Sequence, residues 1–165
     1  MRRERFIASF RKEDGKLPRV EEPGATYFVT VNLLRPAVVN LTHSGVGEIV
    51  REALLHYDGV RYDLFDYTIM PDHVHMILMP MRDGALTYAL DTILYDRKHW
   101  AARQINRAVG RKGDLWQPNN HTHVIRNRAD YEEKARYIFH NPCQAGLVGD
   151  PLKWPWWGRG KGIVT

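Results

Sequence analysis

The stretch that decides the fold reads Asp66-Tyr-Thr-Ile-Met-Pro-Asp-His-Val-His-Met-Ile-Leu78. It contains two largely apolar runs that are joined by Pro71-Asp72, a dipeptide typical of tight turns. Both runs carry the β-branched and aromatic residues that favour strands, so the sequence predicts strands over residues 61–70 and 73–80. Because the pair is mostly apolar, we expect it in the interior of a sheet.

The segments before and after this hairpin alternate between strand and helix patterns. Residues 27–34 are rich in β-branched and aromatic side chains, which predicts a strand. Thr42 or Ser44 can cap a helix that ends near Tyr57. A longer helix is expected from residue 85 or 86 to residue 109.

The C-terminal third adds a strand and a helix. A short strand is predicted near residues 121–125, and a helix is predicted from Asp130, because Asp130 can cap it and Glu133 lies three residues on. Asn141 should end this helix, since Pro142 disfavours a helical conformation in the residue before it. The order β-α-β-β-α-β-α predicts an α+β protein with a ferredoxin-like (RRM-like) antiparallel sheet, helices on one face and an added C-terminal helix.

The composition indicates one folded, intracellular domain. The chain has 165 residues, of which 44% are hydrophobic, too many for a disordered protein. Its longest apolar run, residues 76–81, is far shorter than the ~20 residues of a membrane span, and the single Cys143 suits a reducing compartment. We expect a basic N-terminal arm over residues 1–23, the domain over 24–149, and a Trp/Pro-rich tail over 150–165, without regular structure.

The net charge of +5 is unevenly distributed. Residues 97–112 contain basic side chains and no acidic one, whereas residues 58–96 are acid-rich. Four-residue spacing in the basic block predicts a stripe on one helix face, and the absence of compensating carboxylates favours polyanion binding over a merely solvated face. The candidate polyanion-binding residues are Arg103, Arg107, Arg111 and Lys112 in this block, and Arg2, Arg3 and Arg5 in the arm.

The tripeptide His73-Val74-His75 carries the most chemical information. Alternate residues of a strand share a face, so both imidazoles point the same way and offer two ligands to a divalent metal. The alternative is a pair of histidines on an exposed strand face. The apolar surroundings favour partners for both rings, because burying an unpaired polar group costs ~1–3 kcal/mol.

A second set of residues lies on the C-terminal helix. Tyr137 and Asn141 are one helical turn apart, with Glu133 one turn earlier on the same face. Tyr137 can act as a nucleophile and Asn141 as an oxygen ligand for a metal held by the histidines. The spacing equally allows a tyrosine packed on the sheet and an asparagine that ends a helix, displaced from helical geometry by Pro142.

Two segments together resemble a known family. Met70-Pro-Asp-His-Val-His-Met-Ile-Leu78 and Tyr137-Ile-Phe-His-Asn-Pro-Cys-Gln-Ala-Gly-Leu-Val148 are similar to motifs of the HUH single-strand DNA transposases, and within them of the REP-associated tyrosine transposases. Shorter similar segments extend the resemblance over about residues 24–157. The chain departs from the family pattern at Asp72, where asparagine is more usual, and at residues 119–123, which contain a second His-x-His.

The resemblance implies a DNA strand-transfer enzyme, with residues 24–149 as its HUH transposase domain. It implies a divalent metal, Mg²⁺ or Mn²⁺, on His73, His75 and Asn141. It also implies that Tyr137 is the catalytic nucleophile, which forms a 5′-phosphotyrosine adduct and frees a 3′-hydroxyl. Two alternatives stay open: a catalytically silent nucleic-acid-binding domain, and a metal-dependent phosphodiesterase whose histidines activate water.

The implied partner is single-stranded or hairpin DNA of the REP-palindrome type, and no membrane is implied. Relatives of this kind are expected to act as monomers, although a homodimer that shares the Tyr137 helix stays open. The expected location is the bacterial cytoplasm, at the nucleoid when the protein is bound to DNA. Tryptophans such as Trp116 and Trp154 either stack on exposed bases or pack in the core.

Overall fold

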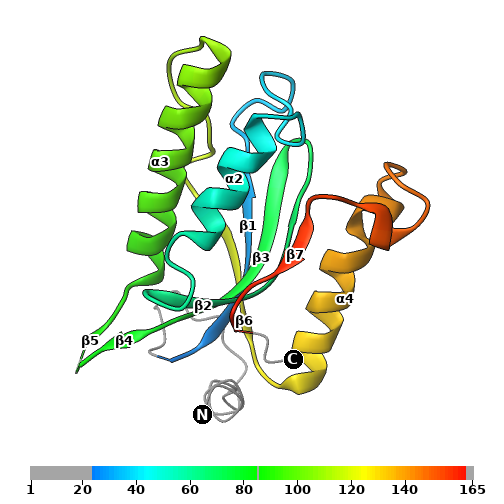
Figure 1. The fold of residues 1–165 in the computed structure, drawn as a ribbon. Coiled ribbons are helices and arrows are strands. Elements are labelled where there is room, and N and C mark those ends of the chain that lie inside the picture. The colour runs from blue at the N-terminus through cyan, green and yellow to red at the C-terminus, as the bar shows by residue number, and fades with distance from the viewer. Residues whose placement is uncertain (1–23, 85, 163–165) are drawn as a thin grey trace.

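A computed structural model describes residues 24–84 and 86–162 of the chain (Figure 1). A five-stranded antiparallel sheet has the strand order β6-β1-β3-β2-β7. Its strands are β1 (Thr26–Asn32), β2 (Tyr62–Ile69), β3 (His73–Pro80), β6 (His121–Ile125) and β7 (Trp157–Arg159). The helices are α2 (Val46–Leu55), α3 (Leu90–Val109), α4 (Arg128–Gln144) and the short 3-10 helix η1 (Pro151–Lys153). A separate small hairpin consists of β4 (Arg82–Asp83) and β5 (Leu86–Thr87).

The predicted ferredoxin-like sheet is confirmed. β3 lies between β1 and β2 and is antiparallel to both, and β6 pairs with the other edge of β1. In Figure 1, α2 and α3 lie together on one side of the sheet, and the added helix α4 lies on the other. The basic arm, with Arg2, Arg3 and Arg5, lies outside the described residues. Within residues 24–84 and 86–162, every helix is too short or too polar to cross a lipid bilayer.

The central strand β3 divides its side chains between two cores. Val74, Met76 and Leu78 belong to the larger core beneath α2 and α3. Ile77 and Met79 belong to a smaller core with Ile138 of α4. Because side chains alternate along a strand, the odd-numbered residues of β3, which include the two histidines, lie on the α4 face.

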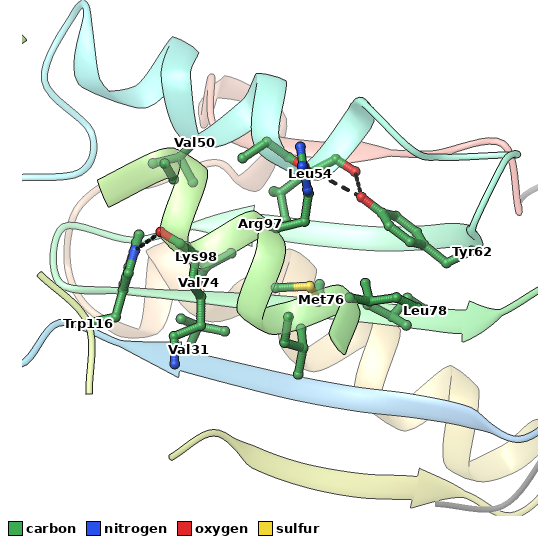
Figure 2. Close-up of a pocket in the computed structure, with 14 residues that line it drawn as sticks. Val31, Val50, Leu54, Tyr62, Val74, Met76, Leu78, Arg97, Lys98 and Trp116 are labelled. Carbon is green, nitrogen blue, oxygen red and sulfur yellow. Dashed lines mark hydrogen bonds between the residues drawn. The ribbon is translucent and has the colours of Figure 1, made fainter. Parts of the chain in front are cut away.

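The face beneath α2 and α3 is a packed core rather than a ligand site (Figure 2). A mostly apolar set of side chains lines a cavity of about 40 Å³ there, which has room for only a few water molecules. The Tyr62 hydroxyl donates a hydrogen bond to the Leu54 carbonyl at 2.6 Å, and Trp116 Nε1 donates to the Lys98 carbonyl at 3.0 Å. Trp116 is thereby placed in the core, one of the two roles that the sequence allowed.

Helix α3 begins later than the sequence pattern predicts. The residues before it form the β4–β5 hairpin, and the Tyr88 amide donates a hydrogen bond to the Met81 carbonyl at 3.0 Å. The first helical residue is Leu90, after Ala89 in an extended conformation. Local helix propensity is overridden here by strand pairing.

Helix α4 begins before Asp130. Asn127 is the cap, and its side chain accepts a hydrogen bond from the Asp130 amide at 2.9 Å. Asp130 lies in the first turn, where its carboxylate accepts hydrogen bonds from the Arg126 amide at 3.0 Å and contacts His123 Nε2 at 2.9 Å. The cap prediction was wrong by about one turn because two residues three positions apart, Asn127 and Asp130, both have side chains that can cap a helix.

The prediction that α4 ends at Asn141 was also wrong. The helix continues through Pro142 to Gln144. Pro142 lacks only its own N–H, and the following amides still bond, since the Ala145 amide donates to the Asn141 carbonyl at 3.0 Å. Both Asn141 and Pro142 are buried, so tertiary packing outweighs the local cost. Asn141 therefore keeps its place one helical turn after Tyr137.

The Trp/Pro-rich tail contains regular structure, contrary to expectation. Its strand β7 pairs with β2 and becomes an edge of the sheet. Trp154 Nε1 donates to the Ile69 carbonyl at 3.2 Å, Trp156 packs against the larger core, and the Trp157 ring meets Phe139 edge-on at 5.0 Å. The three indoles thus hold the tail against the sheet and α4.

Candidate active site

The sheet face beneath α4 brings together three of the residues singled out by sequence. The rings of His73 and His75 are 4.6 Å apart between centroids, and the ring of Tyr137 meets His75 edge-on at 5.3 Å. His73 and His75 come from β3, and Tyr137 comes from the middle of α4. Tyr137 is 42% exposed, so its ring lies at the histidines while remaining accessible from solvent.

His75 is buried and carries one ring nitrogen in need of a partner. It is 5% exposed, and its Nδ1 lies 2.8 Å from the Thr30 hydroxyl on β1. Its Nε2 is buried without a hydrogen-bond partner among the described residues. Burial, with the neighbouring His73, lowers the pKa of His75 from 6.5 to about 3. The ring is therefore neutral at physiological pH and offers a lone pair to a metal.

His73 is oriented by its neighbour in the turn. The Nδ1 atom of His73 lies 2.6 Å from Asp72 Oδ1. A carboxylate at this distance favours the proton on Nδ1 and leaves Nε2 as a lone-pair donor, the usual arrangement around metal-binding histidines. Asp72, the residue that departs from the family pattern, thus has a definite contact in the site.

Asn141 provides an orphaned oxygen on the same helix as Tyr137. It is 8% exposed, and its Oδ1 is buried without a hydrogen-bond partner among the described residues. No group of three or more His, Cys, Asp or Glu side chains in that part of the chain is placed to hold a metal. A metal on the two histidines would therefore need another type of ligand, which the amide oxygen of Asn141 can supply. Buried oxygen and nitrogen lone pairs that have no hydrogen-bond partner among the described residues are suited to coordinate a divalent cation.

Two sets of contacts hold α4 against this face. Phe28 of β1 stacks on His75 at 5.3 Å and meets the Tyr137 ring edge-on at 6.0 Å. In the first turn of α4, the Tyr131 hydroxyl donates a hydrogen bond to Asp66 Oδ2 at 2.5 Å. The other oxygen of this carboxylate accepts from Arg159 Nε at 3.2 Å. Asp66 thus ties β2 to both α4 and β7.

The predicted basic stripe lies on the other side of the sheet. Arg103 and Arg107 are exposed on α3, and Lys112 is exposed beyond its end. Arg111 does not continue the stripe, because the helix ends at Gly110 in a left-handed conformation. The Arg111 guanidinium instead donates to the Asn106 side chain and to the Asp114 carbonyl. The structure therefore does not bring this basic block to the histidines.

Two other cations of the basic block have structural contacts. Arg97 lies over the Tyr57 ring at 4.4 Å. Lys98 Nζ donates to the Gln117 carbonyl at 2.7 Å and to Asn120 Oδ1 at 3.0 Å, and burial lowers the pKa of its amino group. Arg97 and Lys98 are thus engaged in contacts within the protein, although the sequence places them in the basic block.

The second His-x-His lies in β6, the short strand predicted near residues 121–125, which is an edge of the sheet. His123 lies against Asp130, with Nε2 2.9 Å from Oδ2 and 3.1 Å from Oδ1. His121 is exposed and faces Thr30 in the β1–β6 register. These contacts give His123 a hydrogen-bond partner of its own, separate from the metal candidates.

Sequence reasoning missed three residues around the site. Thr30 and Phe28 come from β1, and Lys134 of α4 places its amino group 5.7 Å from the centre of the Phe28 ring. The even-numbered positions of β1 share one face, which was a usable signal. The register that sets Thr30 opposite His75 was not visible in the sequence.

The chain is similar in sequence to two curated proteins that are named for the same activity. It is 30% identical over 134 residues to the REP-associated tyrosine transposase of Escherichia coli (strain K12), covering 80% of this chain and 74% of that protein. A Haemophilus influenzae protein named for the same activity is 27% identical, over 81% of this chain and 78% of its own length. No protein-family model matches.

One solved structure extends the likeness to three dimensions. It is the structure of a REP-associated tyrosine transposase bound to a REP hairpin, with a TM-score of 0.65 and 26% sequence identity. The match covers 87% of this chain and 81% of that one.

Proposed function

Because the chain belongs to the REP-associated tyrosine transposases, we propose that it cleaves and rejoins single-stranded or hairpin DNA with Tyr137 as nucleophile. The observation that carries this proposal is the contact between the Tyr137 ring and His75, whose Nε2 is buried without a hydrogen-bond partner among the described residues. An exposed tyrosine beside two imidazoles that can bind a metal is suited to phosphoryl transfer. A purely structural pair would have its buried nitrogen satisfied.

The ligands for a divalent cation in this proposal are His73, His75 and Asn141. Mg²⁺ or Mn²⁺ there would act as a Lewis acid on the scissile phosphate, an effect worth several kcal/mol. Asp72 holds His73 through Nδ1, and Thr30 holds His75 in the same way. Both contacts reduce the freedom of the rings before any ligand arrives.

Tyr137 performs the covalent step. Its hydroxyl oxygen attacks phosphorus in line, the bond from phosphorus to the 3′ oxygen breaks, and the phenolic proton leaves while the 3′ oxygen gains one. The products are a 5′-phosphotyrosine linkage and a free 3′-hydroxyl. The new linkage keeps the phosphodiester energy, so a second 3′-hydroxyl reverses the step without water or ATP. Packing of Phe28 against both rings limits the positions that Tyr137 samples.

The site is complete within one chain in this proposal. Helix α4 packs on its own sheet through Ile138, which is fully buried, and through the Tyr131–Asp66 hydrogen bond. A second copy is therefore not needed to supply the tyrosine, which favours action as a monomer. The DNA partner is proposed from the relative whose structure contains a REP hairpin.

The test is formation of a covalent adduct. The protein is incubated with labelled hairpin DNA and Mn²⁺, and we expect a DNA–protein adduct that resists SDS. Tyr137→Phe should give none, whereas Tyr88→Phe, a matched change near the β4–β5 hairpin, should react like the wild type. Cleavage without an adduct would indicate a phosphodiesterase that uses water. Binding without cleavage would indicate a silent DNA-binding domain.

A second variant tests the histidine pair. His75→Ala should abolish cleavage and leave hairpin binding at low salt largely intact, because the ring binds the cation rather than the DNA. Circular dichroism of the variant provides the folding control. Parallel loss of folding and binding would show that His75 is structural.

A further inference from the structure

A large groove lies between α3 and the segment that leads into β6. We call it the α3 groove, and its volume is about 1310 Å³. One wall is the face of α3 from Asp91 to Asn106, and the other is residues 113–120 together with Thr122. Pockets for single small molecules commonly measure ~300–1000 Å³, so the α3 groove has room for a segment of a polymer.

The walls of the groove are fixed by hydrogen bonds across it. Lys98 Nζ donates to the Gln117 carbonyl at 2.7 Å and to Asn120 Oδ1 at 3.0 Å. Asn106 Nδ2 donates to the Gly113 carbonyl at 2.9 Å. A preformed groove binds a flexible ligand with a smaller ordering cost on the protein side.

The α3 wall presents an exposed stacking surface beside a cation. The rings of Tyr95 and His99, one turn apart, are stacked with 5.8 Å between centroids and 10° between planes. Tyr95 is 67% exposed, and Arg103 follows one further turn along the same face. Aromatic rings and guanidinium groups in a groove are the features that bind unpaired bases and their phosphates.

The opposite wall presents amide side chains, which read base edges. Asn119 is exposed there, next to Asn120, which is held by Lys98. The acidic lining residues, Asp91 and Asp114, lie towards opposite ends of the groove, in the first turn of α3 and beside Gly113. The stretch between them contains the stacked rings and Arg103, a combination suited to single-stranded nucleic acid.

Edge strand β6 connects the α3 groove with the catalytic face. Thr122 lines the groove, whereas its neighbour His121 pairs with Thr30, whose hydroxyl touches His75 on the other face. Paired strands lie ~4.8 Å apart, so β6 and β3 are separated by roughly 10 Å. A DNA strand that leaves the groove therefore passes the edge of β6 to reach Tyr137.

We propose that the α3 groove holds an unpaired stretch of the DNA substrate that continues around the edge of β6 to the cleaved bond, with a base on Tyr95 and a phosphate on Arg103. This inference rests on the proposed function, because it takes DNA as the partner. It assigns recognition of the unpaired flank to α3 and residues 113–122, and cleavage to the α4 face.

The test compares two fluorescent hairpins with the same duplex, one blunt and one with unpaired extensions. Affinities of the full chain are measured in EDTA, so that no cleavage intervenes. The wild type should bind the extended hairpin more tightly. Tyr95→Ala should weaken binding of the extended hairpin by roughly 5- to 150-fold, the range for loss of one stacked base, and leave binding of the blunt hairpin unchanged. Tyr95→Phe, which keeps the ring, should bind like the wild type.

Arg103→Gln has a matched control in Arg128→Gln, an arginine at the start of α4 with an 85% exposed side chain. Only Arg103→Gln should weaken binding of the extended hairpin. An extension that carries 5-iododeoxyuridine should cross-link to the peptide that contains Tyr95. The inference would be overturned if the wild type and Tyr95→Ala each bound the two hairpins with equal affinity. It would also be overturned if Tyr95→Ala weakened binding of the blunt and the extended hairpin by the same factor.

The inference and the proposed function fail in different assays. If the wild type forms an adduct but binds extended and blunt hairpins with equal affinity, the inference is overturned and the proposed function stands. Extension-dependent binding through Tyr95 without any adduct overturns the proposed function alone and supports the groove.

Discussion

The hydrogen bond between Tyr131 and Asp66 should set how firmly α4 holds Tyr137. Asp66 is 2% exposed, and its Oδ2 accepts from the Tyr131 hydroxyl at 2.5 Å. Burial, and then the Asp66 charge, raise the pKa of Tyr131, so the phenol keeps its proton and donates at every pH that the protein tolerates. Tyr131→Phe removes this donor and leaves the ring, which meets Phe65 edge-on at 5.9 Å.

The expected loss follows from the type of hydrogen bond. A hydrogen bond to a charged group contributes ~1.5–3 kcal/mol, and part of the loss is offset because Arg159 still bonds the other oxygen. We expect the free energy of unfolding to fall by about 2 kcal/mol. In a domain of this size that lowers the melting temperature by about 4–8 °C. Urea unfolding followed by tryptophan fluorescence measures the change.

The control is Tyr95→Phe, which removes the hydroxyl of an exposed tyrosine on α3 and should change stability by less than about 0.5 kcal/mol. Tyr131→Phe should also slow adduct formation at unchanged DNA affinity, because a displacement of ~1 Å at a reacting group costs roughly 100-fold. If Tyr131→Phe and Tyr95→Phe have the same free energy of unfolding and the same rate of adduct formation, Asp66 does not position α4.

Three further outcomes are expected. Gly47→Ala should lower the melting temperature by several degrees, because a Cβ there would lie 2.3 Å from the Trp156 ring and overpacking costs ~1–3 kcal/mol; calorimetry measures it. In EDTA, the urea concentration at the unfolding midpoint should decrease as the pH is lowered from about 7 to about 4. The reason is that His75 takes up a proton below about pH 6.5 in the unfolded chain but only near pH 3 in the folded chain. His75→Gln should make the midpoint less dependent on pH. If Arg107 contacts a phosphate, Arg107→Gln should reduce the slope of log affinity against log salt concentration for the hairpin by about one counterion. Arg128→Gln should leave that slope unchanged.

The parts of the fold that follow from local pattern were predictable. Strands β2 and β3 lie within one residue of the predicted ranges, because their apolar runs and the Pro71-Asp72 turn are encoded in neighbouring residues. The shared face of His73 and His75 follows from strand alternation alone. That Tyr137 lies one turn before Asn141 follows from helical geometry, once α4 is known to continue through Pro142.

The rest depends on contacts between distant residues. Asp66 and Tyr131 are 65 positions apart, and no local pattern couples them. The persistence of α4 at Pro142 and the strand β7 in the tail both result from burial against elements that lie elsewhere in the chain. A single sequence shows the secondary-structure propensity of each segment. In these places tertiary packing outweighs that propensity by a few kcal/mol.

The meaning of the net charge changes once burial is known. The acid-rich stretch suggested an uneven surface field, yet Asp58, Asp63 and Asp66 are buried. Asp58 accepts hydrogen bonds from the Leu64 amide at 2.9 Å and from the Lys161 amide at 2.7 Å. Carboxylates used in this way meet no phosphate, whereas Arg103 and Arg107 on α3 remain exposed. DNA that approaches α3 would therefore meet exposed guanidinium groups that these carboxylates do not contact, which is why we expect its binding to weaken steeply with salt.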